Sequence, residues 1–157
     1  MHEMADPDWK EQLKGCFEDI AILERSRLEA IENFEQFSEF IAEPAFEALE
    51  AELKNYQIRA RHTTRKGRSV GLRLDFRRSK TDHFHYTILL PKNAVELKLH
   101  VQVRGRRTPK AAFEEKVEPF LPGTPPEKLI KLAKEDLLAA VIDRYRDFVL
   151  ESMALSD

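Results

Sequence analysis

The first third of the chain carries apolar residues at a spacing of three and four, which is the period of an amphipathic helix. No Gly or Pro interrupts residues 16–43, and Pro44 favours the first position of a new helix. The pattern therefore predicts a long helix over residues 7–41, about 50 Å in length, and a short helix over residues 44–55. The stripe of the long helix contains Leu13, Cys16, Phe17, Ile20, Leu23, Leu28, Ile31, Phe34, Phe37 and Ile41.

The middle of the chain changes to a strict alternation of apolar and polar residues, which is typical of strands with one buried face. Four such runs lie within residues 56–104, and short turn-forming segments separate them. This alternation predicts a four-stranded antiparallel meander. Residues 105–123 then form a basic connection, in which Thr108 and Pro109 favour the start of a short helix. A further apolar stripe at helical spacing predicts a C-terminal helix over residues 125–154.

Together these elements predict one two-layer α+β domain over residues 1–157. The chain length is near the usual size of a single domain. The N-terminal helices, the C-terminal helix and the sheet each carry one apolar face, so we expect the helices to cover one face of the sheet. The other face is then expected to be open or to contact a partner.

The sheet face opposite the core is polar, and the turns predict how its residues align. The predicted register places Arg59, Asp75, His85 and His100 side by side across the strands, at steps of about 4.8 Å. We interpret this row as ordinary solvated side chains. Aspartate and histidine also suit zinc or ferrous iron, but an open face encloses a metal poorly, so we predict no metal and no cofactor. The same face holds Arg61, Arg73, Arg77, His83, Thr87, Glu96, Lys98, Gln102 and Arg104 and no aromatic residue.

A second set of charged residues on this face suggests a different chemistry. Asp75 is followed twenty-one residues later by Glu96-Leu97-Lys98, and this Asp…Glu-x-Lys pattern resembles the restriction-endonuclease-like superfamily. The resemblance implies a metal-dependent nuclease in which Asp75 and Glu96 hold Mg²⁺ and Lys98 positions or polarises a water molecule. The predicted register separates the two acids by about 9–10 Å, too far to share one ion. We therefore favour a protein that is not an enzyme and assign no catalytic residue.

The net charge of −2 conceals a strong partition along the chain. Residues 1–55 carry 5 Lys and Arg against 15 Asp and Glu, whereas residues 56–110 carry 15 against 3. Residues 111–157 carry 6 against 10. Blocks of one sign indicate either a surface for an oppositely charged partner or two segments that face each other in the fold.

From this partition we expect a non-enzymatic oligomeric interaction or scaffold module, in which acidic helices and a basic sheet complement each other or bind a protein partner. A long helix that projects beyond the sheet would expose its apolar stripe, and a two-fold homodimer is the simplest cover. We therefore expect the stripe to meet itself around Leu13, Phe17, Ile20 and Leu23. The single-chain alternative is a kink near residues 25–27 that folds the helix back onto its own sheet.

The alternative function is the binding of nucleic acid or another polyanion by the basic sheet face and hairpin tips. Lys and Arg neutralise phosphates and release counterions. The absence of an aromatic residue on this face weakens the case for stacking of single strands. The expected binding residues are Arg59, Arg61, Arg73, Arg77, Lys98, Arg104, Arg106 and Arg107, with Arg65, Lys66, Arg68, Arg78, Lys80 and Lys110 at or near the hairpin tips.

Three further features bear on where the protein works. No apolar run approaches the ~20 residues that a membrane-spanning helix needs. The acidic start of the chain is unlike a secretory or mitochondrial leader. The lone Cys16 fits a reducing cytoplasm and is expected to be a small buried thiol in the helix stripe. We therefore expect a cytoplasmic protein.

Overall fold

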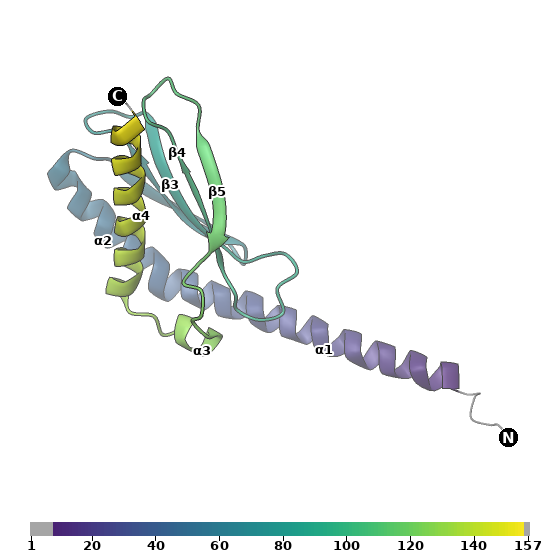
Figure 1. Cartoon of the computed structure of the whole chain (residues 1–157). Coiled ribbons are helices and arrows are strands. Elements are labelled where there is room, and N and C mark those ends of the chain that lie inside the picture. The colour runs from purple at the N-terminus through teal and green to yellow at the C-terminus, as the bar shows by residue number, and fades with distance from the viewer. Residues whose placement is uncertain (1–7, 156–157) are drawn as a thin grey trace.

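The structure is a computed structural model that describes residues 8–155. It has an α+β architecture in which helices precede and follow an antiparallel sheet (Figure 1). The helical elements are α1 (Asp8–Phe37), the π-helical turn η2 (Ser38–Ala42), α2 (Glu43–Leu53), the 3₁₀ turn η3 (Lys54–Tyr56), α3 (Pro126–Leu129) and α4 (Lys134–Leu155). The strands are β1 (Ala60–Arg65), β2 (Ser69–Asp75), β3 (Asp82–Leu89), β4 (His100–Gly105) and β5 (Glu114–Pro119).

The two predicted N-terminal helices form one continuous helical rod, because a π-helical turn joins them. The backbone N–H of Glu43 donates to the carbonyl of Ser38, five residues back. Pro44 lies in the first turn of α2, where a missing N–H costs no helical hydrogen bond. The chain therefore passes the proline without a break.

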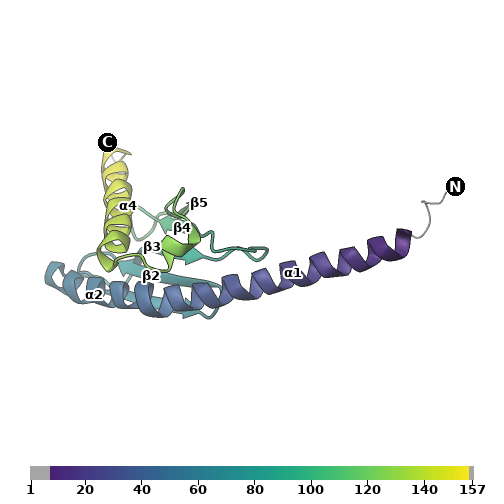
Figure 2. The same ribbon diagram turned by 90° about the horizontal axis from the view of Figure 1, so that it is seen from below.

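The first half of α1 projects beyond the rest of the molecule (Figures 1 and 2). The first buried residue of α1 is Ala30, and the predicted alternative of a kink near residues 25–27 is not formed. Cys16 is exposed, contrary to the prediction of a buried thiol, because the part of the stripe that carries it has nothing packed against it. Within residues 8–155, no helix combines the length and apolarity that crossing a bilayer requires.

The sheet has five strands in the order β1-β2-β3-β4-β5, one more than the sequence predicts. The fifth strand lies in the segment expected to be an irregular connection with a short helix after Thr108. Its sequence, EEKVEP, is polar and almost wholly exposed, so it gives no alternating signal. It forms as an edge strand because β4 offers a free row of backbone groups to pair with. The predicted C-terminal helix is split into α3 and α4.

The register of the sheet differs from the predicted one by even numbers of residues. Arg59 lies opposite Asp75 as predicted, since the Asp75 N–H donates to the Arg59 carbonyl at 2.9 Å. His85 pairs with Arg73 rather than Asp75, and with Arg104 rather than His100. The causes are a bulge at Asp75 and the irregular segment 90–99, which is longer than the predicted turn. Even shifts keep the side chains of the regularly paired residues on their predicted faces but dissolve the predicted row; only past the bulge, at His83, does a side chain change face.

The core lies between one face of the sheet and the helices α1, α2 and α4, which all lie on that side (Figures 1 and 2). Phe34, Phe37 and Phe46 from the rod meet the apolar face of the sheet. His83 was expected on the open face but is buried against Tyr145 and other aromatic rings, because the bulge at the start of β3 turns it toward α4. No helix within residues 8–155 lies on the opposite face of the sheet (Figures 1 and 2).

Candidate functional site

A groove of about 420 Å³ lies on the open face of the sheet, across the first four strands. Its floor includes Gly71, and a Cβ added there would lie 2.8 Å from the Thr87 hydroxyl, so the missing side chain helps to hollow the surface. A glycine inside a strand pattern is the sequence signal that marks such a place. The groove is lined by Arg61, Thr63, Arg65, Ser69, Gly71, Leu72, Arg73, His85, Thr87, Leu89 and Gln102, none of them acidic.

Basic residues form a row across the four strands that the groove spans. Arg61 lies opposite Arg73, Arg73 opposite His85, and His85 opposite Arg104. This row replaces the predicted row of Arg59, Asp75, His85 and His100. Like charges placed directly opposite one another on a sheet repel unless something neutralises them.

The cations of this row are neutralised unevenly. Arg73 is paired with buried and half-buried carboxylates, as described below. Arg61 and Arg65 are exposed, and within residues 8–155 neither forms an ion pair or a side-chain hydrogen bond. The side of the groove formed by β1 therefore presents two unpaired guanidinium groups to solvent.

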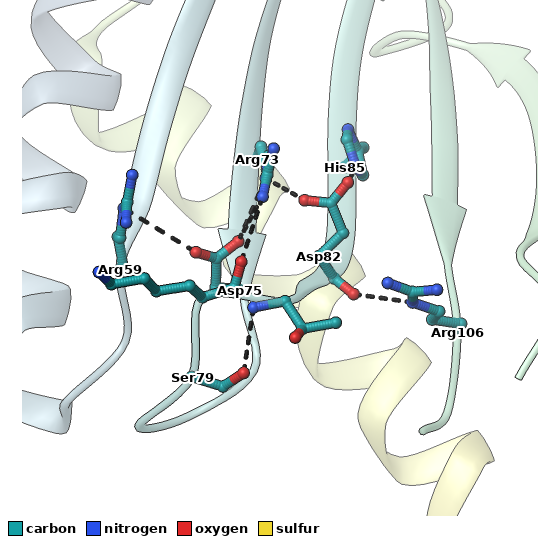
Figure 3. A network of polar contacts seen from close by, with 9 residues as sticks. Arg59, Arg73, Asp75, Ser79, Asp82, His85 and Arg106 are labelled. Carbon is teal, nitrogen blue, oxygen red and sulfur yellow. Dashed lines mark hydrogen bonds and ion pairs between the residues drawn. The ribbon is translucent and has the colours of Figure 1, made fainter. Parts of the chain in front are cut away.

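Asp75 and Asp82 hold Arg73 at the end of the groove (Figure 3). The Asp75 Oδ1 accepts from Arg73 Nε at 3.1 Å and lies 3.1 Å from Arg73 Nη2. Asp82 makes an ion pair with the same guanidinium. The prediction of a solvated Asp75 is wrong: this residue is 2% exposed, because Arg59 and Arg73 cover it. Two carboxylates on one guanidinium fix its orientation, which pre-organises Arg73 at the groove.

His85 is positioned by the same network. Its Nε2–H donates to Asp82 Oδ2 at 3.2 Å. Burial is the main cause that lowers the pKa of His85; the nearby Arg104 and Arg73 lower it further, whereas the hydrogen bond to Asp82 opposes them. At neutral pH the imidazole is therefore uncharged, and it contributes hydrogen bonding to the groove rather than positive charge.

An aromatic ring reaches the open face from the connection between β4 and β5. Phe113 lies under two guanidinium groups, with Arg104 Cζ 3.9 Å and Arg106 Cζ 4.4 Å from its ring centroid. Its ring meets His85 edge-on at 5.9 Å between centroids. The expectation that this face lacks aromatic residues is therefore wrong, because Phe113 precedes a strand that the sequence did not reveal.

Four other predicted binding residues do not line the groove. Arg59 Nε is 3.9 Å from the buried Asp75 Oδ2, and Arg77 donates to the Gln57 side chain at 3.1 Å. Arg106 donates to the Asp82 carbonyl at 2.8 Å, and Arg107 is exposed on the connection after β4. Arg59 and Arg106 therefore adjoin the Asp75–Asp82 network at the end of the groove, whereas Arg77 and Arg107 border a pocket on the α4 side that Tyr145 also lines.

The acids of the nuclease-like pattern do not meet. Asp75 lies opposite Asp82 in the strand ladder, at the start of β3. Glu96 comes after the other end of β3, and this strand is about 24 Å long. Glu96 instead pairs with Lys98 at 2.9 Å, and His100 is exposed at the start of β4. Among residues 8–155, no cluster of three or more His, Cys, Asp or Glu side chains has an arrangement that suits a metal ion.

His62 lies on the core side of the edge strand β1 and contacts the acidic helix α2. Its Nδ1 is 2.6 Å from Glu50 Oε2, and its Nε2 is 3.9 Å from Glu47 Oε1. The acidic residues of α2 thus meet β1 on the covered face of the sheet and leave the groove arginines unneutralised.

Comparison of the chain with protein-family models, curated proteins and solved structures finds no match.

Proposed function

We propose that this protein binds single-stranded nucleic acid in the groove on the open face of its sheet. The observation that carries the proposal is the pair of unpaired guanidinium groups, Arg61 and Arg65, in a groove whose lining contains no carboxylate. The planar, forked arginine side chain matches phosphate oxygens, and each contact releases counterions from the nucleic acid. A surface of this kind gains most from a ligand with repeated negative charges.

The rest of the groove supports a single strand. Hydroxyl groups of Thr63 and Thr87 supply hydrogen bonds that suit phosphate and sugar, whereas the Gln102 amide N–H already donates to Glu115 on β5. Phe113 lies beside the groove and packs against the Arg104 and Arg106 guanidinium groups, so it orients two planar cations on which a base can stack. Few groups in this set discriminate between bases, so we expect weak dependence on sequence.

The scaffold interpretation explains this face less well. It needs acidic helices that neutralise the basic sheet, but the glutamates of α2 face His62 on the core side. The low overall isoelectric point does not oppose the proposal, because most acids of the chain lie in the helices and none lines the groove. A cytoplasmic location, which would keep the exposed Cys16 reduced, fits this function.

The test is fluorescence anisotropy with a labelled oligothymidylate over a series of salt concentrations. The variant Arg61→Gln/Arg65→Gln removes the two unpaired cations and leaves the Arg73 network intact. Each lost phosphate contact in a single strand reduces the salt slope by about 0.7, so the double variant should bind more weakly with a slope shallower by about 1.4.

The matched control is Lys131→Gln/Lys134→Gln, which removes the same charge from exposed positions at and before the start of α4. This control should keep the affinity and salt slope of the parent. Absence of binding by the parent at low salt, or equal losses in the two variants, would refute a nucleic-acid site in the groove.

A further inference from the structure

The projecting half of α1 carries an apolar stripe that nothing in the described chain covers. Residues 8–29 extend beyond the sheet (Figure 2). Trp9 is 65% exposed, Leu13 49% and Leu23 52%. Aligned apolar side chains of this size form a contiguous exposed patch, which is uncommon on a monomer and marks an interaction surface.

The stripe has the heptad spacing of a coiled coil. Steps of four and three residues connect Trp9, Leu13, Cys16, Ile20, Leu23, Arg27, Ala30, Phe34 and Phe37. The last three residues of this series are buried in the core. The exposed part is therefore the direct continuation of a face that already packs, and its two-in-seven pattern fits another helix of the same kind.

We propose that two copies of this chain pair through their projecting α1 helices in antiparallel orientation. The exposed stretch of this series runs from Trp9 to Arg27, whose Nη2 donates to the Lys92 carbonyl at 3.0 Å, so its midpoint is residue 18. Full overlap of two antiparallel stretches centred there places Leu13 against Leu23 of the second copy, and Cys16 against Ile20 of the second copy. The overlap of the two helices stops near Ala30, because from that residue onward α1 is packed against its own sheet.

Charge favours the antiparallel arrangement over the parallel one. In the antiparallel pair, Lys10 flanks the seam opposite Glu24 of the second copy, and this contact occurs twice. In a parallel pair, Asp19 would instead face Glu24 of the second copy, also twice. The antiparallel pair has one unfavourable contact, Asp19 with its own counterpart near the two-fold axis. The antiparallel pair therefore has two favourable charge contacts and one unfavourable contact, whereas the parallel pair has two unfavourable contacts. This difference favours an antiparallel pair of two copies.

The first part of the test is the mass in solution, measured by light scattering over a wide concentration range. The parent should have twice the chain mass, and Ile20→Glu/Leu23→Glu should have the chain mass. The matched control is Ile22→Glu, because Ile22 is 55% exposed on the opposite side of the helix, and this variant should remain a dimer. Circular dichroism checks that each variant is folded.

The second part tests orientation by disulfide formation with diamide as the oxidant. In the antiparallel pair the two Cys16 residues are offset by about 6 Å along the axis, in addition to the separation of the helices, which exceeds disulfide reach. Ile20→Cys should therefore cross-link, whereas the parent and Cys16→Ser/Ile20→Cys should not. A parent of single-chain mass, a charged stripe variant that stays dimeric, or efficient cross-linking of the parent would overturn the proposal.

Discussion

Replacement of Asp75 by Asn tests how the end of the groove is built. Asp75 is 2% exposed, and its Oδ1 accepts from Arg73 at 3.1 Å. Its Oδ2 is buried without a hydrogen bond and faces Arg59 Nε at 3.9 Å. Asparagine keeps the shape of the side chain but removes the charge, and it places an amide donor where one carboxylate oxygen faces a guanidinium.

The expected cost follows from these contacts. A buried donor without an acceptor costs about 1–3 kcal/mol, and hydrogen bonds to charged groups contribute about 1.5–3 kcal/mol. The loss is partial, because the Arg73 side chain is 32% exposed and keeps its ion pair with Asp82. We therefore expect Asp75→Asn to lower the free energy of unfolding by about 2 kcal/mol.

The assay is urea denaturation followed by circular dichroism, with Glu96→Gln as the matched control. Glu96 pairs with Lys98 at 2.9 Å, but their side chains are 49% and 77% exposed, so the control should lose no more than about 0.5 kcal/mol. If Asp75→Asn lost as little as the control, Asp75 would be solvated and the buried network would not exist in solution.

Two further predictions concern the same region. The Asp75→Asn variant should bind the oligothymidylate more tightly than the parent even though it is less stable, because Arg73 then has one neutralising carboxylate fewer; weaker binding in anisotropy would contradict this. His83 is buried and its pKa is lowered chiefly by desolvation, so the unfolded chain takes up the proton first and stability should fall as the pH drops below about 6.5. His83→Phe should reduce the slope of the free energy of unfolding against pH below 6.5. An unchanged slope would mean that groups other than His83 cause the pH dependence of stability.

The faces of the sheet were predictable from the sequence, whereas the alignment of its strands was not. Alternation alone determines which side of a strand is apolar, and the observed register shifts of two and four residues leave that side unchanged. The neighbours of His85 depend on where the strands begin, and that was set by a bulge at Asp75 and by the irregular residues 90–99. Neither feature has a signature in the alternating pattern.

The fifth strand and the aromatic ring beside it were missed for one physical reason. β5 is held by backbone pairing to β4, and backbone pairing does not require apolar side chains at an edge. Phe113 lies just before this strand, so its approach to His85 depends on a strand that hydrophobic periodicity does not reveal. Candidate residues on regular strands, such as Arg61 and Arg73, were identified because parity was enough to place them.

The buried acids explain how a row of like charges persists on one face of a stable sheet. Arg61, Arg73, His85 and Arg104 form one row across strands β1 to β4. The three arginines of this row would repel one another if nothing neutralised them. Asp75 and Asp82 neutralise Arg73. The ring of Phe113 lies under Arg104 and stabilises its charge by a cation–π contact. Arg61 has no such partner among the described residues, so the charge that the fold leaves unrelieved lies on the side of the groove where a phosphate has access.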